Sequence, residues 1–175
     1  MIVSNAGPIL AFARANHFDL LRDVIQILII PNAIYEEIVI RGVGRPGSEE
    51  VSRAEWIRRK HVSQRTVVKG FPKALHLGER EAIALAYARG DVLLIDDRAA
   101  RRVAEEYGVR CMGSLRVLEE AKDRALIPAI KPILDDLIFS GLYISASLYQ
   151  SFLCHIGEER EHSVILTPHR EPLYN

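Results

Sequence analysis

The stretch Val92-Leu93-Leu94-Ile95-Asp96-Asp97-Arg98 decides the fold class of this chain. A short, wholly apolar run is typical of a strand that is buried on both faces, as strands are in parallel sheets covered by helices. Two adjacent carboxylates end the run, and Arg98 opens a segment with helical spacing. Ligands of open α/β sheets bind just beyond the carboxyl ends of the strands. We therefore expect Asp96 and Asp97 to lie where chemistry is done.

Short apolar runs alternate with helical segments over most of the chain. Strands are predicted at 2–4, 27–30, 91–95 and 109–112, and the middle of the chain offers only edge-strand candidates at 62 and 66–68. Helices are predicted at 8–13, 19–24, 31–40, from 48 onward, 79–88, 98–107, 114–125, 128–139 and 145–156, with Ser48 and Ser114 as expected N-caps. Strands that alternate with helices indicate βαβ units, and so an α/β fold of three layers around a mostly parallel sheet.

The composition is that of a globular protein. The 175 residues are 49% hydrophobic and 26% charged, and their formal net charge is zero. The chain therefore has enough apolar mass for a core but lacks a global basic field, so any contact with a polyanion must come from a local patch. We expect a single domain over residues 1–157 and a polar tail at 158–175 that is poorly ordered or docks late. Two cysteines without metal-type spacing, and the lack of a signal peptide or membrane span in the sequence, predict a cytoplasmic protein with reduced thiols.

Polar and acidic residues recur at the ends of the predicted strands and at the starts of the helices that face them. They are Ser4-Asn5, Glu36-Glu37, Glu79 with Glu81, and Asp96-Asp97. Hard oxygen ligands that converge from separate strands are what Mg²⁺ or Mn²⁺ requires, and such ions activate water for attack on phosphate esters. The pattern therefore predicts a divalent-metal site at this edge of the sheet.

Structural roles compete with this interpretation at each acidic position. Glu79 lies in the first turn of its helix, where the helix dipole alone favours a carboxylate. The other glutamates fit a solvated helix face, and helical spacing does not decide between Glu36 and Glu37. One aspartate of the Asp96-Asp97 pair can cap the next helix, but two adjacent ones are harder to explain by capping. This favours a functional role for the pair.

Three arginines follow the aspartate pair: Arg98, Arg101 and Arg102. At positions i, i+3 and i+4 they share one edge of the predicted helix. Such an edge either neutralises the carboxylates or positions the phosphates of a nucleic-acid backbone, and the spacing does not choose between these roles.

Taken in order, five segments resemble the motifs of PIN domains. Val3-Ser4-Asn5-Ala6-Gly7-Pro8-Ile9-Leu10 resembles the family's opening Ser-Asp-Thr-Ser-Pro-Leu-Ile, and Ile30-Pro31-Asn32-Ala33-Ile34-Tyr35-Glu36-Glu37-Ile38 resembles its Ile-Pro-x-x-Val-x-x-Glu-Leu segment. Leu77-Gly78-Glu79-Arg80-Glu81-Ala82-Ile83-Ala84-Leu85-Ala86 resembles a Gly-Glu-x-Glu-Ala-Ile-x-Leu-Ala block of one PIN subgroup. Leu94-Ile95-Asp96-Asp97-Arg98 and Gly113-Ser114-Leu115 resemble the late Leu-x-Thr-x-Asp and Gly-Thr-Leu blocks, with Ile95 in place of the threonine.

The resemblance covers about residues 1–156 and is nearest to an uncharacterised PIN-like subgroup related to the toxin ribonucleases of toxin–antitoxin pairs. It implies a five-stranded parallel sheet, an acidic pocket for Mg²⁺ or Mn²⁺, and cleavage of single-stranded or structured RNA. It also implies a homodimer and an antitoxin protein as partner. Matched by position, the implied catalytic set is Asn5, Glu37, Glu79 and Asp97, and the implied metal ligands are Asn5, Glu79, Asp96 and Asp97, with Asp97 ahead of Asp96. In a ribonuclease of this kind, the basic edge of Arg98, Arg101 and Arg102 would bind the phosphates of the RNA.

Asn5 departs from the family, which has an aspartate at this position. An amide oxygen can coordinate a hard cation, but it carries no charge, so metal affinity should fall and the pKa of an activated water should rise. Two functions stay open: a metal-dependent ribonuclease, and a non-catalytic PIN-like module that binds RNA or protein with a degenerate metal site. A receiver-like signalling domain also has paired acids after a strand, but no separate phosphoacceptor aspartate with a distal lysine is evident in this sequence.

Overall fold

The computed structural model describes residues 1–62 and 70–158, which fall into two compact units, Met1–Ile144 and a C-terminal unit that begins at Ser145. The first unit contains the sheet, and the second contains the helix α10 (Ala146–His155). Ser145 caps α10, because its hydroxyl oxygen accepts a hydrogen bond from the amide of Leu148 at 3.2 Å. The edge-strand candidate at 66–68 and residues 159–175 of the predicted tail lie outside the described residues.

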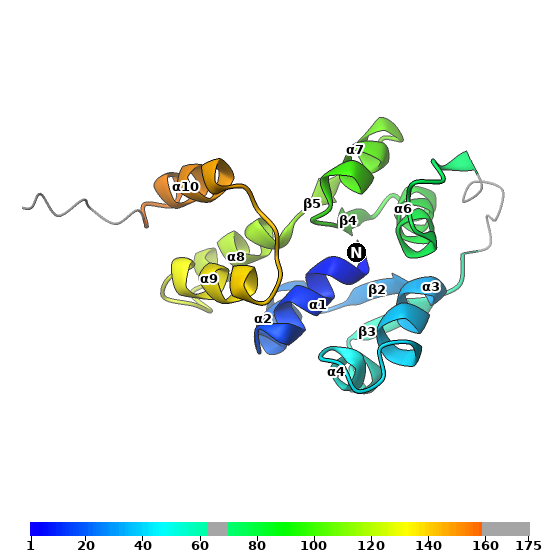
Figure 1. The fold of residues 1–175 in the computed structure, drawn as a ribbon, viewed down its shortest axis with the longest axis horizontal. Coiled ribbons are helices and arrows are strands. Elements are labelled where there is room, and N and C mark those ends of the chain that lie inside the picture. The colour runs from blue at the N-terminus through cyan, green and yellow to red at the C-terminus, as the bar shows by residue number, and fades with distance from the viewer. Residues whose placement is uncertain (63–69, 159–175) are drawn as a thin grey trace, which may run out of the picture. The chain divides into compact units, whose positions relative to one another are not determined.

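A parallel sheet of five strands runs through the first unit (Figure 1). The strands are β1 (Ile2–Ser4), β2 (Leu28–Pro31), β3 (Ile57–Lys60), β4 (Val92–Leu94) and β5 (Cys111–Met112), in the spatial order β3-β2-β1-β4-β5. Every neighbouring pair is parallel, which confirms the predicted α/β class. The chain builds the sheet from β1 towards β3 and then returns to the other side of β1 with β4. This reversal makes the gap between the carboxyl ends of β1 and β4 a topological switch point, the place where open α/β sheets bind ligands.

Helices of the first unit connect the strands, as the βαβ pattern predicts, and the last two of them follow the final strand. They are α1 (Ala6–Arg14), α2 (Phe18–Ile25), α3 (Asn32–Tyr35), the π-helical turn η1 (Glu36–Ile40), α4 (Ser48–Arg53), α6 (Leu77–Arg89), α7 (Arg98–Glu106), α8 (Ser114–Asp123) and α9 (Lys131–Phe139). Gly90 ends α6 in the left-handed conformation, with φ of 64°, as expected for a glycine after the last helical turn. Within the described ranges, no helix combines the length and the apolar character that a membrane crossing needs.

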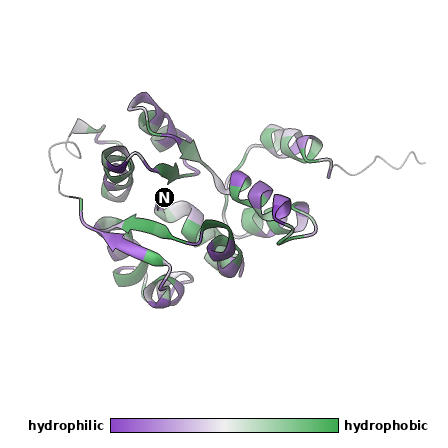
Figure 2. Ribbon diagram, turned by 180° about the vertical axis from the view of Figure 1, so that it is seen from behind, coloured by the Kyte–Doolittle hydropathy of each residue, from purple (hydrophilic) through white to green (hydrophobic). Residues whose placement is uncertain are grey.

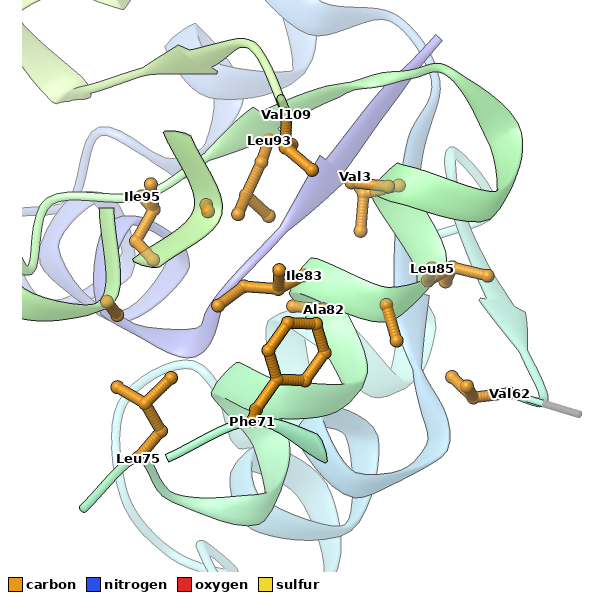
Figure 3. Packing of buried hydrophobic residues seen from close by; sticks show 14 of the residues in the cluster. Val3, Val62, Phe71, Leu75, Ala82, Ile83, Leu85, Leu93, Ile95 and Val109 are labelled. Carbon is orange, nitrogen blue, oxygen red and sulfur yellow. The ribbon is translucent and has the colours of Figure 1, made fainter. Parts of the chain in front are cut away.

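The core on one face of the sheet lies under α6 and α7. Val3, Leu93 and Ile95 project from the strands and their ends, and they pack against Ala82 and Ile83 of α6 (Figure 3). Small alanines on the buried side of α6 let this helix approach the strands closely, and Ala82, Ala84 and Ala86 have no exposed surface. Phe71 and Leu75 close the same cluster from the segment before α6.

The alternate residues of the strands face the opposite side. Side chains along a strand point alternately to the two faces of a sheet, which places Leu28, Ile30 and Leu94 on this side. All three are fully buried. Phe12 of α1 and Leu118 of α8 are also fully buried. Both faces of the central strands are therefore apolar. In Figure 2 the central strand β2 is coloured hydrophobic, whereas the edge strand β3 beside it is coloured hydrophilic.

The edge strand β3 was not predicted from the sequence. It is formed by Ile57–Lys60, whose last three residues are all exposed, and residue 62, one of the two edge-strand candidates, lies outside it. An edge strand borders only one neighbour and can be polar, so its sequence lacks the apolar run that marks a central strand.

The predicted helix at 31–40 divides into α3 and the π-helical turn η1. The amide of Arg41 donates to the carbonyl of Glu36 at 2.8 Å, a bond that spans five residues and defines the wider π turn. Propensity and periodicity do not distinguish such a turn from an ordinary helix.

Two predicted N-caps were wrong by one residue. Gly47 and Gly113 hold the cap positions, whereas Ser48 and Ser114 are the first helical residues. Both serine hydroxyls are buried and bond elsewhere: Ser48 Oγ donates to the carbonyl of Val39 at 3.2 Å, and Ser114 Oγ donates to Asp96.

Candidate active site at the carboxyl ends of β1 and β4

Asn5 follows β1 and lies beside the end of β4. Its backbone amide donates to the carbonyl of Leu94 at 3.0 Å, which extends the pairing of the two strands by one step. The side chain is 7% exposed, and its Oδ1 accepts a hydrogen bond from the amide of Ala6 at 2.7 Å, so Asn5 is the N-cap of α1. The residue thus occupies the switch point, and its oxygen already serves a backbone group.

Asp96 lies two residues beyond β4 and is held by the start of α8. Its Oδ1 accepts from the amide of Ser114 at 2.7 Å, and its Oδ2 accepts from Ser114 Oγ at 2.6 Å. Burial raises the pKa of Asp96, and the two bonds from Ser114 and the charge of Arg101 oppose that rise without cancelling it. A proton is therefore retained on Asp96 to a higher pH than on an ordinary aspartate.

Gly113 makes this close approach feasible. A Cβ atom at this position would lie 3.0 Å from Asp96 Oδ1 and 2.9 Å from Arg101 Nη2, so any side chain would push both groups away. Arg101 Nη2 donates to the carbonyl of Ile95 at 2.7 Å and so fixes the backbone just before the aspartates. The end of β4, the Gly113–Ser114 step and Arg101 therefore form one supported unit around Asp96.

Asp97 has a different environment from Asp96. Its side chain is exposed, and its Oδ1 accepts from the amide of Ala100 at 2.8 Å, which makes it the N-cap of α7. The capping role that the sequence left open for one member of the pair therefore belongs to Asp97. The neighbouring carboxylate points back into the protein.

Both aspartates line an open cavity of about 510 Å³. Its wall is formed by one side of α1, the turn that leads into α7, and the segment 140–143 after α9. Arg14 and Arg98 contribute to the wall, and Tyr143, 84% exposed, lies at it as well. Among the described residues, neither of these two arginines has a carboxylate within ion-pair distance. The cavity thus brings together two carboxylates, two arginines that form no ion pair with the described residues, and an exposed aromatic ring.

The predicted glutamates lie around the contact between α3, η1 and α6. Glu79 Oε2 accepts from the amide of His76 at 2.8 Å, and Glu81 Oε2 accepts from the amide of Ala33 at 3.1 Å. Glu37 Oε2 lies 3.2 Å from the position that a Cβ atom of Gly78 would take. Two of these carboxylates therefore satisfy backbone amides at helix starts, as the dipole interpretation of Glu79 anticipates. The cavity wall formed by the described residues includes none of the three.

The three predicted RNA-binding arginines do not share one free edge. Arg101 is directed towards β4, and its Nη1 lies 3.9 Å from Glu105. Arg102 pairs with Glu106 at 3.1 Å on the outside of α7. Arg98 lies at the cavity. The residues that sequence reasoning missed are Arg14 and Tyr143, which come from α1 and from the end of the first unit and are joined to the site only by the fold.

The donor set of the cavity suits a hard divalent cation that keeps part of its water shell. Only carboxylate and amide oxygens are offered by Asp96, Asp97 and the adjacent Asn5, and Mg²⁺ is commonly held by one or two carboxylates together with waters and substrate phosphates. In the described part of the chain, no three His, Cys, Asp or Glu side chains gather closely enough to form a complete ligand cage. The residues therefore fit Mg²⁺ or Mn²⁺ as a hydrated ion, and they do not fit a zinc centre of nitrogen and sulfur ligands.

These features define a three-layer α/β domain with an acidic site at its topological switch point. A family model described as a PIN domain matches residues 1–158, and the chain belongs to that family. This membership supports a nuclease-like module in general, of a kind that commonly depends on divalent metal ions.

A solved structure with a similar fold is a PilT N-terminus domain protein from the hyperthermophilic archaeon Sulfolobus solfataricus P2. The two chains are 14% identical, with a TM-score of 0.49, and the match covers 83% of this chain and 98% of the other. The comparison with curated proteins gave no match.

Proposed function

We propose that the protein is a metal-dependent ribonuclease of the toxin type, which hydrolyses RNA phosphodiesters with water as the nucleophile. The observation that carries this proposal is the Asp96–Asp97 pair, which ends a buried strand at the switch point and lines a cavity together with Arg14 and Arg98. Carboxylates and arginines in one cavity supply the two things a phosphodiester needs: a place for a divalent cation and donors for its charged oxygens.

In this proposal Asp96 and Asp97 hold Mg²⁺ or Mn²⁺, and Asn5 contributes a neutral oxygen. When bound, the ion supplies Lewis-acid stabilisation of the charge that develops on the phosphate. Ser114 keeps the Asp96 carboxylate in one orientation through two short hydrogen bonds. A carboxyl group must lose its proton before it can bind a cation, and burial raises the pKa of Asp96. Activity should therefore rise with pH as Asp96 ionises.

The other side chains of the cavity bind and orient the RNA. Arg14 and Arg98 would bind phosphate oxygens, since their guanidinium groups match phosphates in shape and charge. Tyr143 offers an exposed ring on which a base of single-stranded RNA can stack. The predicted roles of Glu37, Glu79, Arg101 and Arg102 stay predictions. Glu79, Arg101 and Arg102 each have a structural contact, and Glu37 and Glu79 lie outside the cavity wall formed by the described residues.

The test is Mn²⁺-dependent cleavage of a labelled single-stranded RNA by the wild type, Asp96→Asn and Asp97→Asn. Asp123→Asn, at the end of α8, is the matched control, because it removes the same charge outside the cavity wall. We expect the control to cleave like the wild type and Asp96→Asn to lose at least tenfold in rate, the magnitude for a lost transition-state interaction of about 1.4 kcal/mol. If wild type cleaves and both cavity variants cleave equally fast, the proposed mechanism is wrong.

A non-catalytic module is the second candidate, and the environment of Asn5 favours it. The amide oxygen is buried and engaged by Ala6, and no complete ligand cage of three acidic, His or Cys side chains exists among the described residues. Calorimetry with Mg²⁺ and Mn²⁺ separates the candidates. Binding that tightens in Asn5→Asp supports a weakened metal site, whereas no heat at millimolar ion in either protein supports the module.

The toxin assignment also includes an antitoxin partner, a homodimer and a cytoplasmic location. These proposals are supported by the resemblance of the sequence to the toxin-related PIN subgroup. Co-expression with the product of a neighbouring small reading frame, followed by co-purification and light scattering, tests the partner and the dimer together. A monomer that captures no such product contradicts this part of the proposal.

A further inference from the structure

A second cluster of polar side chains lies at the same edge of the sheet, at the ends of β2 and β3. The strands pair with Pro31 opposite Lys60, so Asn32 and His61, the residues that follow, leave the sheet side by side. Arg59 precedes them on β3, and Tyr35 lies one turn further along α3. This cluster of Asn32, Tyr35, Arg59 and His61 is called the β3 cluster here.

The side-chain amide of Asn32 contacts two neighbouring side chains at once, Arg59 through its oxygen and His61 through its nitrogen. Arg59 Nε donates to Asn32 Oδ1 at 2.7 Å, and because a guanidinium can only donate, the oxygen of the amide must face Arg59. The nitrogen of the amide then faces His61 Nδ1, which lies 3.2 Å away. Since an amide N–H₂ can only donate, His61 Nδ1 is the acceptor, and the neutral ring carries its proton on Nε2. The geometry therefore assigns the tautomer and leaves Nε2–H as a donor.

Arg59 is fixed from a second side by Tyr35. The guanidinium carbon lies 4.7 Å from the centroid of the Tyr35 ring, within the range of a cation–π contact. Stacking sets the plane of the guanidinium, and the bond to Asn32 sets its rotation in that plane. Among the described residues no carboxylate lies within ion-pair distance of Arg59, whereas Arg53, Arg102 and Arg116 all pair with glutamates. Within residues 1–62 and 70–158, Arg59 is thus an oriented cation that no carboxylate neutralises.

The surroundings of the β3 cluster are basic. Arg58, Arg59, Lys60 and His61 follow one another and are all exposed. Figure 2 shows β3, which contains the first three of them, coloured hydrophilic. Charged residues on an edge strand also discourage pairing with other sheets, and this accounts for a lysine or an arginine there. It does not account for the anchoring of Arg59 and His61 on a single amide.

We propose that Arg59 and His61, oriented by Asn32, form a binding site for a phosphodiester of single-stranded RNA. The proposal rests on the proposed function, which supplies RNA as the ligand. The Nη groups of Arg59 and Nε2–H of His61 donate to the phosphate oxygens, and the fork of the guanidinium suits two of them.

The position of the β3 cluster relates it to the acidic cavity. All strands are parallel, so their carboxyl ends meet at one edge, and β3 is three strand spacings from β4. At about 4.8 Å per spacing the separation is roughly 14 Å, a span that a short stretch of RNA can bridge. A strand bound at Arg59 can therefore cross the ends of β2 and β1 and reach Asp96, and the site would hold substrate away from the cut.

Fluorescence anisotropy with a labelled single-stranded RNA of about 12 nucleotides, in EDTA and at several salt concentrations, tests the site. Arg59→Ala should weaken binding roughly fivefold or more, and the slope of log affinity against log salt should fall by about 0.7, the value for one phosphate contact on a single strand. Asn32→Ala should weaken binding with an unchanged slope, because the charge of Arg59 stays while Arg59 and His61 lose their orientation. Arg116→Ala is the matched control. It removes the same charge from α8, which follows β5, the edge strand on the other side of the sheet from β3.

Thermal unfolding of each variant confirms that it is folded, and Arg59→Lys serves if Arg59→Ala is not; the lysine should keep the salt slope and lose affinity. Equal binding of wild type, Arg59→Ala and Arg116→Ala, or of wild type and Asn32→Ala, overturns the proposal. The cleavage assay separates it from the proposed function. A protein that binds RNA through Arg59 but does not cleave it refutes the ribonuclease alone, and one that cleaves RNA with both β3-cluster variants unchanged refutes the binding site alone.

Discussion

Replacing Ser114 with alanine removes the hydroxyl that holds Asp96, and its effect on stability should depend on pH. The bond from Ser114 Oγ to Asp96 Oδ2 is 2.6 Å long, and Ser114 has no exposed surface. A hydrogen bond to a charged group contributes about 1.5–3 kcal/mol, and a neutral one about 0.5–1.5 kcal/mol. We therefore expect Ser114→Ala to lower the free energy of unfolding by about 1.5–3 kcal/mol where Asp96 is ionised, and by less where it is protonated.

The sign follows from the direction of the shift. Burial raises the pKa of Asp96 in the folded state above its unfolded value, which is about 3.9 for an ordinary aspartate. The contribution of Asp96 to stability is therefore fully present below about pH 4 and is lost as the pH rises through the folded pKa. Removal of the Ser114 donor raises that pKa further and deepens the loss. The penalty of Ser114→Ala should thus grow between pH 4 and pH 7.5.

Urea unfolding at both pH values measures this penalty. Ser48→Ala is the matched control, because Ser48 is also buried and first in its helix, but its hydroxyl donates to a carbonyl, which does not titrate. Its cost should be about 0.5–1.5 kcal/mol at either pH. In an Asp96→Asn background the pH dependence of Ser114→Ala should disappear. A penalty that is the same at both pH values, or that persists unchanged beside Asn at position 96, would refute this account of the pair.

Three further results are expected, two from substitutions and one from thiol labelling. Gly78→Ala should lower the free energy of unfolding by about 1–3 kcal/mol, because the new Cβ would lie 2.5 Å from a buried isoleucine, whereas Gly7→Ala, which meets nothing within 4 Å, should raise it by up to about 1 kcal/mol in urea unfolding. Burial opposes the ionisation of Asp91, but hydrogen bonds from an arginine and the terminal amine outweigh burial and lower its pKa. The stability that Asp91 adds is therefore present above about pH 4 and is lost as the pH falls. Asp91→Asn should reduce the fall in melting temperature on the acid side of a pH profile. A thiol reagent should label exposed Cys154 well before Cys111, whose pKa is raised by partial burial, and equal rates would contradict this order.

The central strands could be predicted from the sequence because burial on both faces leaves only one kind of residue there. Leu93, Leu94 and Ile29 all sit between two helical layers, so the apolar run itself reports the environment. The edge strand Ile57–Lys60 is mostly exposed to water, so its residue types are determined by charge and solubility as much as by packing. The spatial order of the strands is not encoded locally, so the switch point between β1 and β4 emerges only when the chain is folded.

The same distinction explains what could be predicted of the site. The aspartate doublet after a buried strand predicts where the candidate site lies, and in the structure both residues line one cavity. Which carboxylate turns inward is decided by Ser114, eighteen residues away, and Arg101 is directed to the Ile95 carbonyl by that same packing. Arg14 lies on α1, far from the doublet along the chain. Spacing within one helix could group Arg101 with its neighbours, but it could not reveal these contacts.

The polar residues at this edge of the sheet share a structural task, and this bears on the departure at position 5. Asn5, Asp97 and Glu79 each accept a hydrogen bond from a backbone amide at or just before the start of a helix. Capping needs an oxygen, not a charge, so asparagine performs it as well as aspartate. Asparagine at position 5 therefore keeps the cap of α1, and the only contribution it would remove is the electrostatic one to the proposed metal site. It follows that Asn5→Asp should change the free energy of unfolding little at neutral pH, since the start of α1 favours a negative charge, while the affinity for Mn²⁺ increases. A variant that is strongly destabilised without any gain in metal affinity would show that the amide is required by the fold.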